Sequence, residues 1–204
     1  KTGDSKWISS EESRKYVHNL RHTSDAIMAG VNTVLTDNPR LTARCGSTGG
    51  TLKKQPLRVV IDDKGRTPLD AQIFNEPGKV LLAVGNIIEP EKKEALSKAG
   101  ADVLKLPSQK GLIDLEQLLK TLAEQEITSV LVEGGGISLG SLFDHRLVDK
   151  VIIYIAPIII GGEKAKTAVA GQGVEKVTDA FKLENMKVEN FGPDLMISGY
   201  VKNT

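Results

Sequence analysis

The sequence is poor in the residues that build disulfides and metal centres. Cysteine occurs once, as Cys45, so no disulfide can form within the chain. The only histidines are His18, His22 and His145. The first two could share a metal from one side of a helix, but no third ligand lies near them, and an exposed helix face is the plainer interpretation. We therefore expect no metal site.

Long apolar runs and an excess of one charge are also lacking. No stretch approaches the roughly 18 apolar residues that span a membrane, and no signal peptide is recognisable. Lys and Arg number 27 against 26 Asp and Glu, which gives no support for nucleic acid or an anionic membrane as a partner. These absences predict a cytoplasmic protein in which any anionic ligand is bound by a local group of cations.

Aromatic residues make up only 4% of the chain, whereas hydrophobic residues of all kinds make up 40%. A core of aliphatic side chains is typical of α/β proteins with parallel strands rich in Val and Ile. The 204 residues fit one domain with a substantial core, and we find no internal repeat or interior linker.

Apolar runs and helical patterns alternate along most of the chain. Helices are expected at 11–23, 91–99 and 115–125, a helical turn at 31–35, strands at 25–29, 57–61, 80–84, 102–106, 129–132 and 150–156, and a hairpin at 181–200. This order predicts an α/β fold with three layers, α/β/α, and a mostly parallel mixed sheet with antiparallel C-terminal strands. Of the two serines before the first helix, Ser9 is the better N-cap because Glu12 completes a capping box.

The most informative stretch is 129–143, SVLVEGGGISLGSLF. An apolar strand, expected to be buried on both faces, ends at Glu133, and Gly134–Gly136 then lead into a helical pattern from Ile137. Free N–H groups at such a helix start favour a phosphate or pyrophosphate, although a plain strand-to-helix turn is the alternative. Glu133 lies where open α/β sheets bind ligands, or it is simply an anion stabilised by the helix dipole.

A second stretch, 31–44, reads VNTVLTDNPRLTAR and follows no packing period. Thr33, Asp37 and Arg44 are therefore candidates for binding. The alternative is a surface turn in which Asp37 is a cap and Arg44 a solvated charge. Trp7, ahead of the first helix, is a candidate core or staple residue.

Six segments carry a resemblance to a known family: SKWIS at 5–9, Arg21, the stretch 31–44, RVVID at 58–62, VEGGG at 132–136 and YIAPIIIGG at 154–162. On these residues the chain resembles the reductase domain of the bifunctional bacterial riboflavin-biosynthesis deaminase/reductase, which is similar in fold to dihydrofolate reductase. The resemblance covers essentially the whole chain.

The resemblance implies NADPH-dependent reduction of the ribosyl group of 5-amino-6-(5-phosphoribosylamino)uracil to a ribityl group, by hydride transfer to the sugar C1′. It implies that the substrate contacts are Ser5, Arg21, Leu41, Arg44 and Glu133. It implies that the NADPH contacts are Trp7, Thr33, Asp37, Gly135, Gly136, Ile137, Ser138, Leu139, Gly140 and Ser141. Arg21 and Arg44 are the expected cations for a sugar phosphate, and either Glu133 or Asp37 could move the proton.

The chain departs from the family pattern in two ways. The strand and turn that normally precede SKWIS are missing, and so is the zinc deaminase signature, H-x-E with a later P-C-x-x-C. We therefore expect a single reductase domain over 1–204, without its first strand, with a deaminase domain in the parent protein. The family pairs through its reductase domains, which implies a homodimer with the strands at 150–156 and 181–200 near the interface.

Two other functions stay open. One is a dihydrofolate reductase-like NADPH reductase of another small phosphorylated substrate, and the other is a non-catalytic dimerisation domain. No arginine is plainly placed for the 2′-phosphate of NADPH, and the candidates are Lys64, Arg66 and Asn86.

Overall fold

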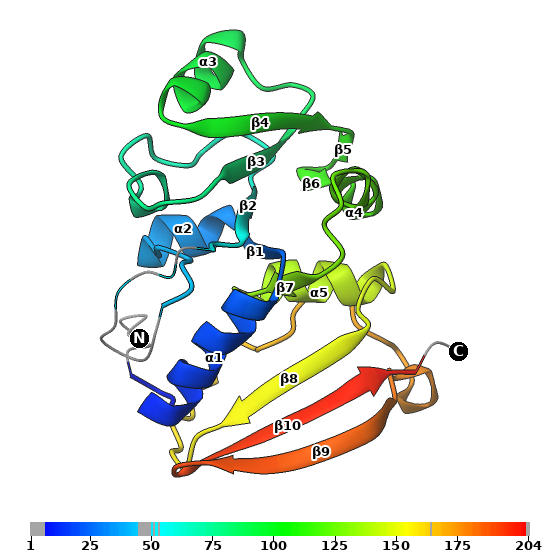
Figure 1. The fold of residues 1–204 in the computed structure, drawn as a ribbon. Coiled ribbons are helices and arrows are strands. Elements are labelled where there is room, and N and C mark those ends of the chain that lie inside the picture. Colours follow the sequence, from blue (N-terminus) through cyan, green and yellow to red (C-terminus); the bar gives the residue numbers. More distant parts are fainter. Residues whose placement is uncertain (1–6, 45–49, 51, 53, 164, 203–204) are drawn as a thin grey trace.

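The centre of the fold is a five-stranded parallel sheet (Figure 1). The computed structural model describes residues 7–44, 50, 52, 54–163 and 165–202. The strands, in their order across the sheet, are β4 (Ala101–Leu106), β3 (Val80–Gly85), β2 (Leu57–Ile61), β1 (Ala26–Gly30) and β7 (Val130–Val132). Every neighbouring pair is parallel, as short Val- and Ile-rich runs separated by helices predict.

Helices cover both faces of this sheet. Val34 of α2 (Val31–Asp37) and Leu96 of α3 (Pro90–Lys98) belong to the buried cluster on one face. Leu118 of α4 (Leu115–Glu124) and Leu142 of α5 (Gly136–Asp144) belong to the cluster on the other. The predicted three-layer architecture is confirmed.

The antiparallel C-terminal strands are also confirmed, and they form a sheet of their own. Its order is β8 (Lys150–Ile155), β10 (Asp194–Val201) and β9 (Leu183–Phe191). The helix α1 (Glu11–Thr23), at its predicted bounds, packs on this sheet, with the rings of Tyr16 and Phe191 4.8 Å apart. Within the described residues, β7 pairs only with β1 and β8 only with β10.

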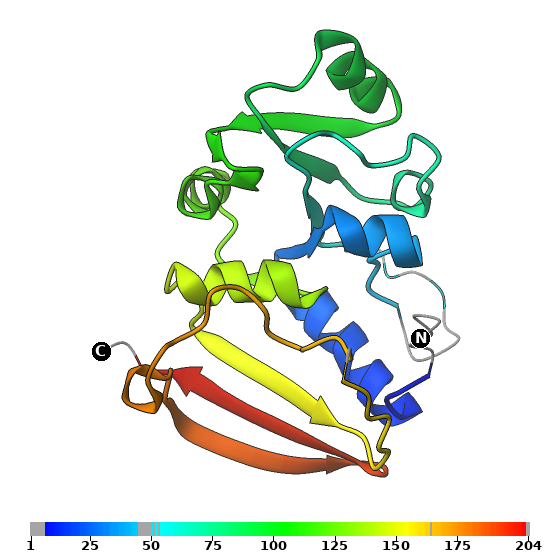
Figure 2. The same ribbon diagram turned by 180° about the vertical axis from the view of Figure 1, so that it is seen from behind.

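Two connections shape the surroundings of the parallel sheet. A small hairpin of β5 (Ser108–Gln109) and β6 (Leu112–Ile113) follows β4, and its strands are too short to leave a sequence pattern. The chain between β8 and β9, which includes the 3-10 helix η2 (Val177–Asp179), crosses α5 (Figure 2). There the Ala170 N–H donates to the Gly136 carbonyl at 2.9 Å. A second 3-10 helix, η1 (Gln72–Phe74), precedes β3.

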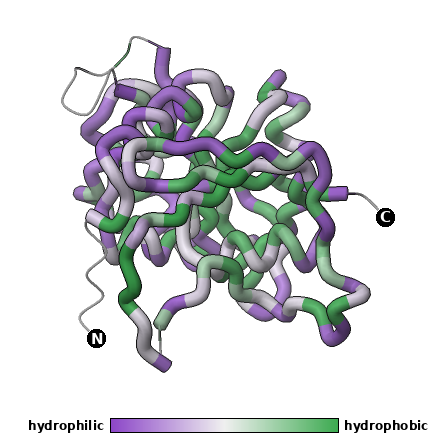
Figure 3. Tube along the Cα trace, turned by 90° about the horizontal axis from the view of Figure 1, so that it is seen from below, coloured by the Kyte–Doolittle hydropathy of each residue, from purple (hydrophilic) through white to green (hydrophobic). Residues whose placement is uncertain are grey.

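Hydropathy follows this architecture. Apolar segments run through the middle of the molecule, and hydrophilic segments lie mostly around them (Figure 3). None of the helices in the described part of the chain is long and apolar enough to cross a membrane.

Several local predictions are wrong for tertiary reasons. Ser10, and not Ser9, caps α1, because its N–H donates to the Asp194 carboxylate at 2.7 Å while its hydroxyl accepts from the Ser13 N–H. The short strand β7, expected to be buried on both faces, is partly exposed because it is an edge of the parallel sheet in the described chain.

Two side chains near α1 also differ from expectation. His18 is buried, not on an exposed helix face, because α1 packs against the segment that carries Thr42. Trp7 is 73% exposed, so it is no core residue, and the Arg14 guanidinium stacks on its ring at 4.4 Å from the ring centroid.

Candidate active site

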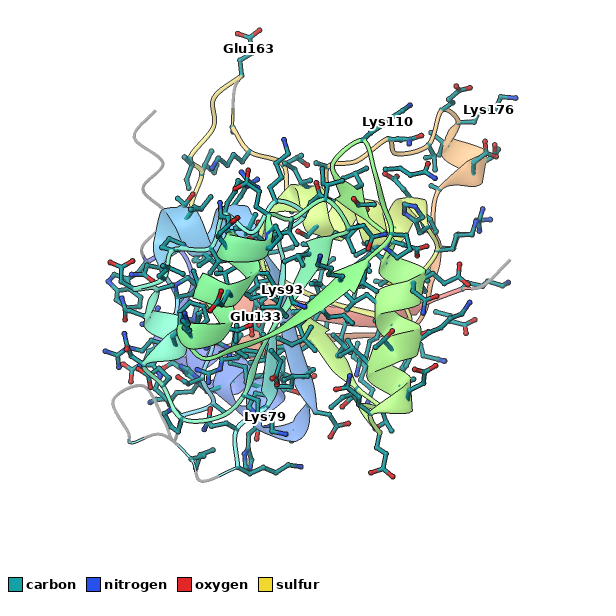
Figure 4. The ribbon with its side chains drawn as sticks, turned by 90° about the horizontal axis from the view of Figure 1, so that it is seen from above. Lys79, Lys93, Lys110, Glu133, Glu163 and Lys176 are labelled. Atoms are coloured by element: carbon teal, nitrogen blue, oxygen red, sulfur yellow. The ribbon has the colours of Figure 1, made fainter. Side chains whose placement is uncertain are left out.

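Glu133 and Arg21 form a bidentate ion pair where the parallel sheet meets α1. The Glu133 N–H extends the pairing of β7 by donating to the Met28 carbonyl at 2.9 Å. Arg21, in the last turn of α1, donates from Nε to Oε1 at 2.7 Å and from Nη2 to Oε2 at 2.6 Å. The side chains are only 15% and 23% exposed, and Glu133 lies near the middle of the molecule in Figure 4. The pair therefore holds the carboxylate in a fixed orientation.

The third nitrogen of the Arg21 guanidinium, Nη1, also makes a hydrogen bond, since it donates to the Thr42 carbonyl at 3.1 Å. Arg21 and Glu133, both predicted as substrate contacts, are thus brought together by the fold. Arg21 also lines a cavity, but three of its five N–H groups already donate to other residues of the protein.

A small cavity of about 350 Å³ lies beside this pair. Its lining residues are Trp7, Arg21, Asp37, Pro39, Arg40, Leu41 and Arg44. Burial, and then the neighbouring charge of Arg21, lowers the pKa of the Arg44 guanidinium. Arg44 Nε is buried and has no hydrogen-bond partner within the described residues. The cavity thus gathers three arginines, one of them with an unused donor, which suits a phosphate or carboxylate.

Leu41 holds an uncommon backbone conformation in the wall of this cavity. Its φ is +50°, a value that is strained for a branched side chain, and the residue is buried in the core cluster. Strain of this kind collects at ligand sites. It gives a physical reason to keep Leu41 among the substrate-contact candidates.

His18 lies next to the arginines without adding to their charge. Burial, followed by the charges of Arg21 and Arg44, lowers its pKa to about 4. Its Nδ1 lies 3.2 Å from the Thr42 carbonyl, so the neutral ring donates a proton there. The positive charge of the small cavity therefore comes from the arginines alone near neutral pH.

A larger cavity, about 780 Å³, lies at the carboxyl ends of β1, β2 and β7. Six of the predicted cofactor residues line it, namely Thr33, Gly135, Gly136, Ile137, Ser138 and Ser141. Its volume lies within the range of small-molecule and cofactor sites, at the edge where open α/β sheets bind ligands.

The other predicted cofactor residues lie elsewhere. Trp7 and Asp37 line the small cavity with the arginines, whereas Leu139 and Gly140 line neither. Gly140 instead allows close packing, since a Cβ there would lie 2.1 Å from the Ala170 carbonyl oxygen. Ser5, a predicted substrate contact, lies outside the described residues. The roles of these five residues, like those of the residues that line the large cavity, stay predictions.

The start of α5 fits the pyrophosphate of a dinucleotide. No heavy atom lies within 4 Å of a Cβ built on Gly135, so the space in front of this residue is open. The Gly135 N–H donates to Thr33 Oγ1 at 3.3 Å, and the next two N–H groups, of Gly136 and Ile137, have no acceptor within the described chain. Unpaired donors at a helix start attract an anion, and Lys166 adds a cation to the same cavity.

Two residues were not predicted to belong to the site, although Tyr154 begins one of the segments that carry the resemblance. Lys166 lies in the segment that crosses α5, and only the tertiary fold brings it to the cavity. The hydroxyl of Tyr154, on β8, is buried, and burial, then the charges of Tyr16 and Glu133, raises its pKa to about 12. Tyr154 therefore stays a neutral phenol near neutral pH.

A cavity of this size at the carboxyl edge of a parallel sheet, with free N–H groups at a helix start and a second, cationic cavity elsewhere, is typical of an α/β domain that binds a nucleotide. The chain belongs to the RibD C-terminal domain family, whose model matches residues 1–197. The resemblance found in the sequence is thereby confirmed.

Named relatives agree with this family. The chain is 37% identical over 197 residues to the riboflavin biosynthesis protein RibD of Actinobacillus pleuropneumoniae, covering 96% of this chain and 51% of that protein. It is 38% identical over 202 residues to the 2,5-diamino-6-ribosylamino-4(3H)-pyrimidinone 5′-phosphate reductase of Methanothermobacter thermautotrophicus, covering 98% of this chain and 90% of that protein. The chain therefore spans about half the length of the RibD relatives.

A solved structure from Thermotoga maritima confirms the fold. It is described as a diaminohydroxyphosphoribosylaminopyrimidine deaminase/5-amino-6-(5-phosphoribosylamino)uracil reductase. The two chains superpose with a TM-score of 0.71 at 28% identity, over 98% of this chain and 51% of that one.

Proposed function

We propose that this chain reduces the ribosyl group of 5-amino-6-(5-phosphoribosylamino)uracil to a ribityl group, with NADPH as the reductant. The observation that carries the proposal is that the Arg21–Glu133 pair links the small cavity to the segment that continues into the wall of the large one. Arg21 lines the small cationic cavity, and Glu133 is two residues from Gly135 in the wall of the large one. A phosphorylated substrate and a dinucleotide bound in these cavities would meet at the Glu133 carboxylate.

The chemistry asks the protein mainly to hold two ligands face to face. Opening of the ribosylamine ring leaves an imine at the sugar C1′, and reduction adds a hydride to this carbon and a proton to the nitrogen. A bound nicotinamide supplies the hydride. Positioning of the reactants can lower such a barrier by ~7–11 kcal/mol.

Each residue of the site has a distinct part in this proposal. Arg44, with its unused Nε donor, binds the substrate phosphate. Glu133 stabilises the iminium that forms when the imine is protonated, and Arg21 orients the carboxylate. Asp37 is exposed in the wall of the small cavity, so Glu133 is the better-supported candidate for the proton transfer.

A second substrate has support of its own. The Methanothermobacter relative, matched over 90% of its length, is named as a reductase of the diaminopyrimidinone, which carries an amino group where the uracil carries an oxygen. Both bases are neutral, so the charged side chains among the described lining residues of the two cavities do not distinguish them. A deaminase domain in the parent protein is supported by the Thermotoga protein, which is named for both activities.

The proposed function is tested by NADPH oxidation, followed by nicotinamide absorbance, with each ribosylaminopyrimidine phosphate as substrate. We expect turnover with the uracil substrate and a ribityl product by mass spectrometry. If only the diaminopyrimidinone is turned over, that compound and not the uracil is the substrate. NADPH binding without turnover of either would leave another reductase substrate as the better hypothesis. Binding of neither ligand would favour the non-catalytic domain.

We also propose that the chain forms a homodimer through the antiparallel sheet. In the registers Leu195–Ile155, Ile197–Ile153 and Ile197–Val188, apolar side chains of all three strands share one face. Four of these five are between 41% and 61% exposed, which is unusual for a sheet face in a monomer. A second copy of the same face is the simplest complement.

Replacing Ile153 by lysine is expected to split this dimer, because a charge would have to be buried at the centre of the interface. Sedimentation at micromolar concentration should give twice the chain mass for the wild type and the chain mass for Ile153→Lys. Val177→Lys is the matched control, since Val177 is 91% exposed and lies outside this face. A wild-type monomer with full activity would contradict the proposal.

A further inference from the structure

The segment 41–44 carries two lining residues of the small cavity, Leu41 and Arg44, at its two ends. Between them, Thr42 and Ala43 are completely buried. Leu41 has its φ of +50° at the start of this segment, and strained backbone persists only where the surrounding structure holds it in place. The groups that bind the backbone of the two buried residues therefore also determine where Arg44 lies.

Thr42 is held from the side of α1. Its carbonyl accepts a hydrogen bond from Arg21 Nη1 at 3.1 Å and lies 3.2 Å from His18 Nδ1. Both of these side chains come from α1, so one carbonyl of the segment is bound by two groups of the same helix. The helix thus fixes the first half of the segment but makes no such contact with the backbone of Ala43.

Ala43 is held from the other side by the amide of Gln55. Gln55 Oε1 accepts from the Ala43 N–H at 2.9 Å, and Gln55 Nε2 donates to the Ala43 carbonyl at 2.9 Å. The same Nε2 donates to the Leu52 carbonyl at 2.7 Å. One side chain therefore satisfies both backbone groups of a completely buried residue, as a neighbouring strand would.

Gln55 is itself fixed by its surroundings. Pro56 follows it, and a proline restricts the preceding residue to extended backbone conformations. A Cβ built on Gly78 would lie 2.9 Å from Gln55 Cβ, so the chain at Gly78 packs directly against this side chain. The Gly78 carbonyl in turn accepts from Nη2 of the buried Arg58 at 2.8 Å. The Gln55 amide is therefore held in one place and can act as a rigid clamp.

We infer that Gln55 is a positioning residue for the substrate phosphate, because through Ala43 it fixes the orientation of Arg44 before the phosphate binds. Gln55 lines neither cavity, so it acts through Arg44 and not by touching the substrate. Arg44 Nε is buried and has no hydrogen-bond partner within the described residues, so the backbone that carries Arg44 sets the direction of this donor. The inference rests on the proposed function, in which Arg44 binds the phosphate.

A fixed backbone strengthens binding for two reasons. Charge-assisted hydrogen bonds depend on direction, so a small rotation of the guanidinium weakens them. An arginine that is already ordered also loses less conformational freedom when the phosphate binds. Without the clamp, Ala43 and Arg44 can shift and the strain at Leu41 can relax, while Thr42 stays bound to α1. We therefore expect weaker phosphate binding in a chain that still folds.

The test is calorimetric titration of the whole chain, without NADPH, with 5-amino-6-(5-phosphoribosylamino)uracil and with its dephosphorylated form. Gln55→Met removes the hydrogen bonds of the amide but keeps an unbranched side chain of similar length. We expect it to weaken binding of the phosphorylated compound about threefold or more, and of the dephosphorylated compound less than about twofold. Added to Arg44→Ala, it should change the affinity less than about twofold, because the residue through which it acts is gone.

Asp144→Ala is the matched control. The Asp144 carboxylate accepts from the N–H groups of Gln172 and Gly173 at 2.8 and 3.1 Å, so it too clamps backbone, but at the end of α5 and in neither cavity. This variant should melt at a lower temperature and bind the phosphorylated compound like the wild type. Gln55→Asn, whose amide is too short to reach Ala43, is the second variant should Gln55→Met not fold, and the same loss is expected.

The outcomes separate this inference from the proposed function. If the Gln55 variants bind the phosphorylated compound like the wild type, or weaken both compounds equally, the inference is wrong while the proposed function stands. The same holds if Gln55→Met weakens the Arg44→Ala variant by as large a factor as it weakens the wild type, since Gln55 then acts independently of Arg44. A wild type that binds neither compound would overturn both.

Discussion

Replacing Arg44 by alanine is expected to raise the KM for the phosphorylated substrate about tenfold or more, with little change in the affinity for NADPH. Arg44 is the arginine of the small cavity with a buried, unused donor. A charge-assisted hydrogen bond contributes about 1.5–3 kcal/mol, and about 1.4 kcal/mol corresponds to a factor of ten. Steady-state kinetics with each ligand varied in turn provide the measurement.

Arg40→Ala is the control for this prediction. Arg40 lines the same cavity, but its Nε already contacts Glu76 at 3.2 Å and Gln72 at 3.1 Å, and its side chain is 53% exposed. We expect its KM to change less than about threefold. If Arg44→Ala binds substrate normally and loses NADPH, the small cavity belongs to the cofactor and the assignment is reversed.

The sequence predicted the parts of the fold that local patterns determine. The strands around 57–61 and 80–84 and the helix over 11–23 were found because apolar runs and the 3.6-residue period determine them. The two-residue strands β5 and β6 were missed because a pair so short carries no periodicity. The division into two sheets depends on which strands pair, and no local pattern contains that information.

The sequence named individual candidate residues of the site, but it did not predict which of them contact one another. VEGGG and the stretch 31–44 pointed to segments that line the two cavities, and these cavities contain most of the candidates. Arg21 donates to Glu133 because α1 lies near the end of β7 in the fold. The chain between α1 and β7 is 106 residues long, so no local pattern predicts this pairing. Lys166 was missed for the same reason.

The three glycines of VEGGG also have surroundings that the sequence could not predict. Three consecutive glycines look equivalent in the sequence, yet each has a different surrounding. Gly134 has φ +147° and lies against Thr33, and a Cβ on Gly136 would lie 2.6 Å from the Thr167 carbonyl oxygen. Gly135 has φ −67° and ψ 156°, which any residue can adopt, and faces open space. Only Gly135 can be replaced without disturbing its neighbours.

Gly135→Val is therefore expected to fold and to lose its cofactor. The branched side chain would project toward the N–H groups at the start of α5 and keep a pyrophosphate off the backbone, so NADP⁺ affinity should fall about tenfold or more. Loss of a glycine N-cap costs the helix up to about 1 kcal/mol, so only a small decrease in melting temperature is expected. Calorimetric titration with NADP⁺ and thermal unfolding of the free protein are the two measurements.

Gly140→Ala provides the contrasting control for this experiment. Its Cβ would collide with the Ala170 carbonyl 2.1 Å away, so this variant should unfold at a clearly lower temperature because the segment that crosses α5 must shift. The two variants thus separate loss of the site from loss of packing. A Gly135→Val protein that melts like the wild type and still binds NADP⁺ with unchanged affinity would remove the glycine turn from the cofactor site. In that case the pyrophosphate would have to bind elsewhere in the large cavity, where Lys166 is the remaining cation beside α5.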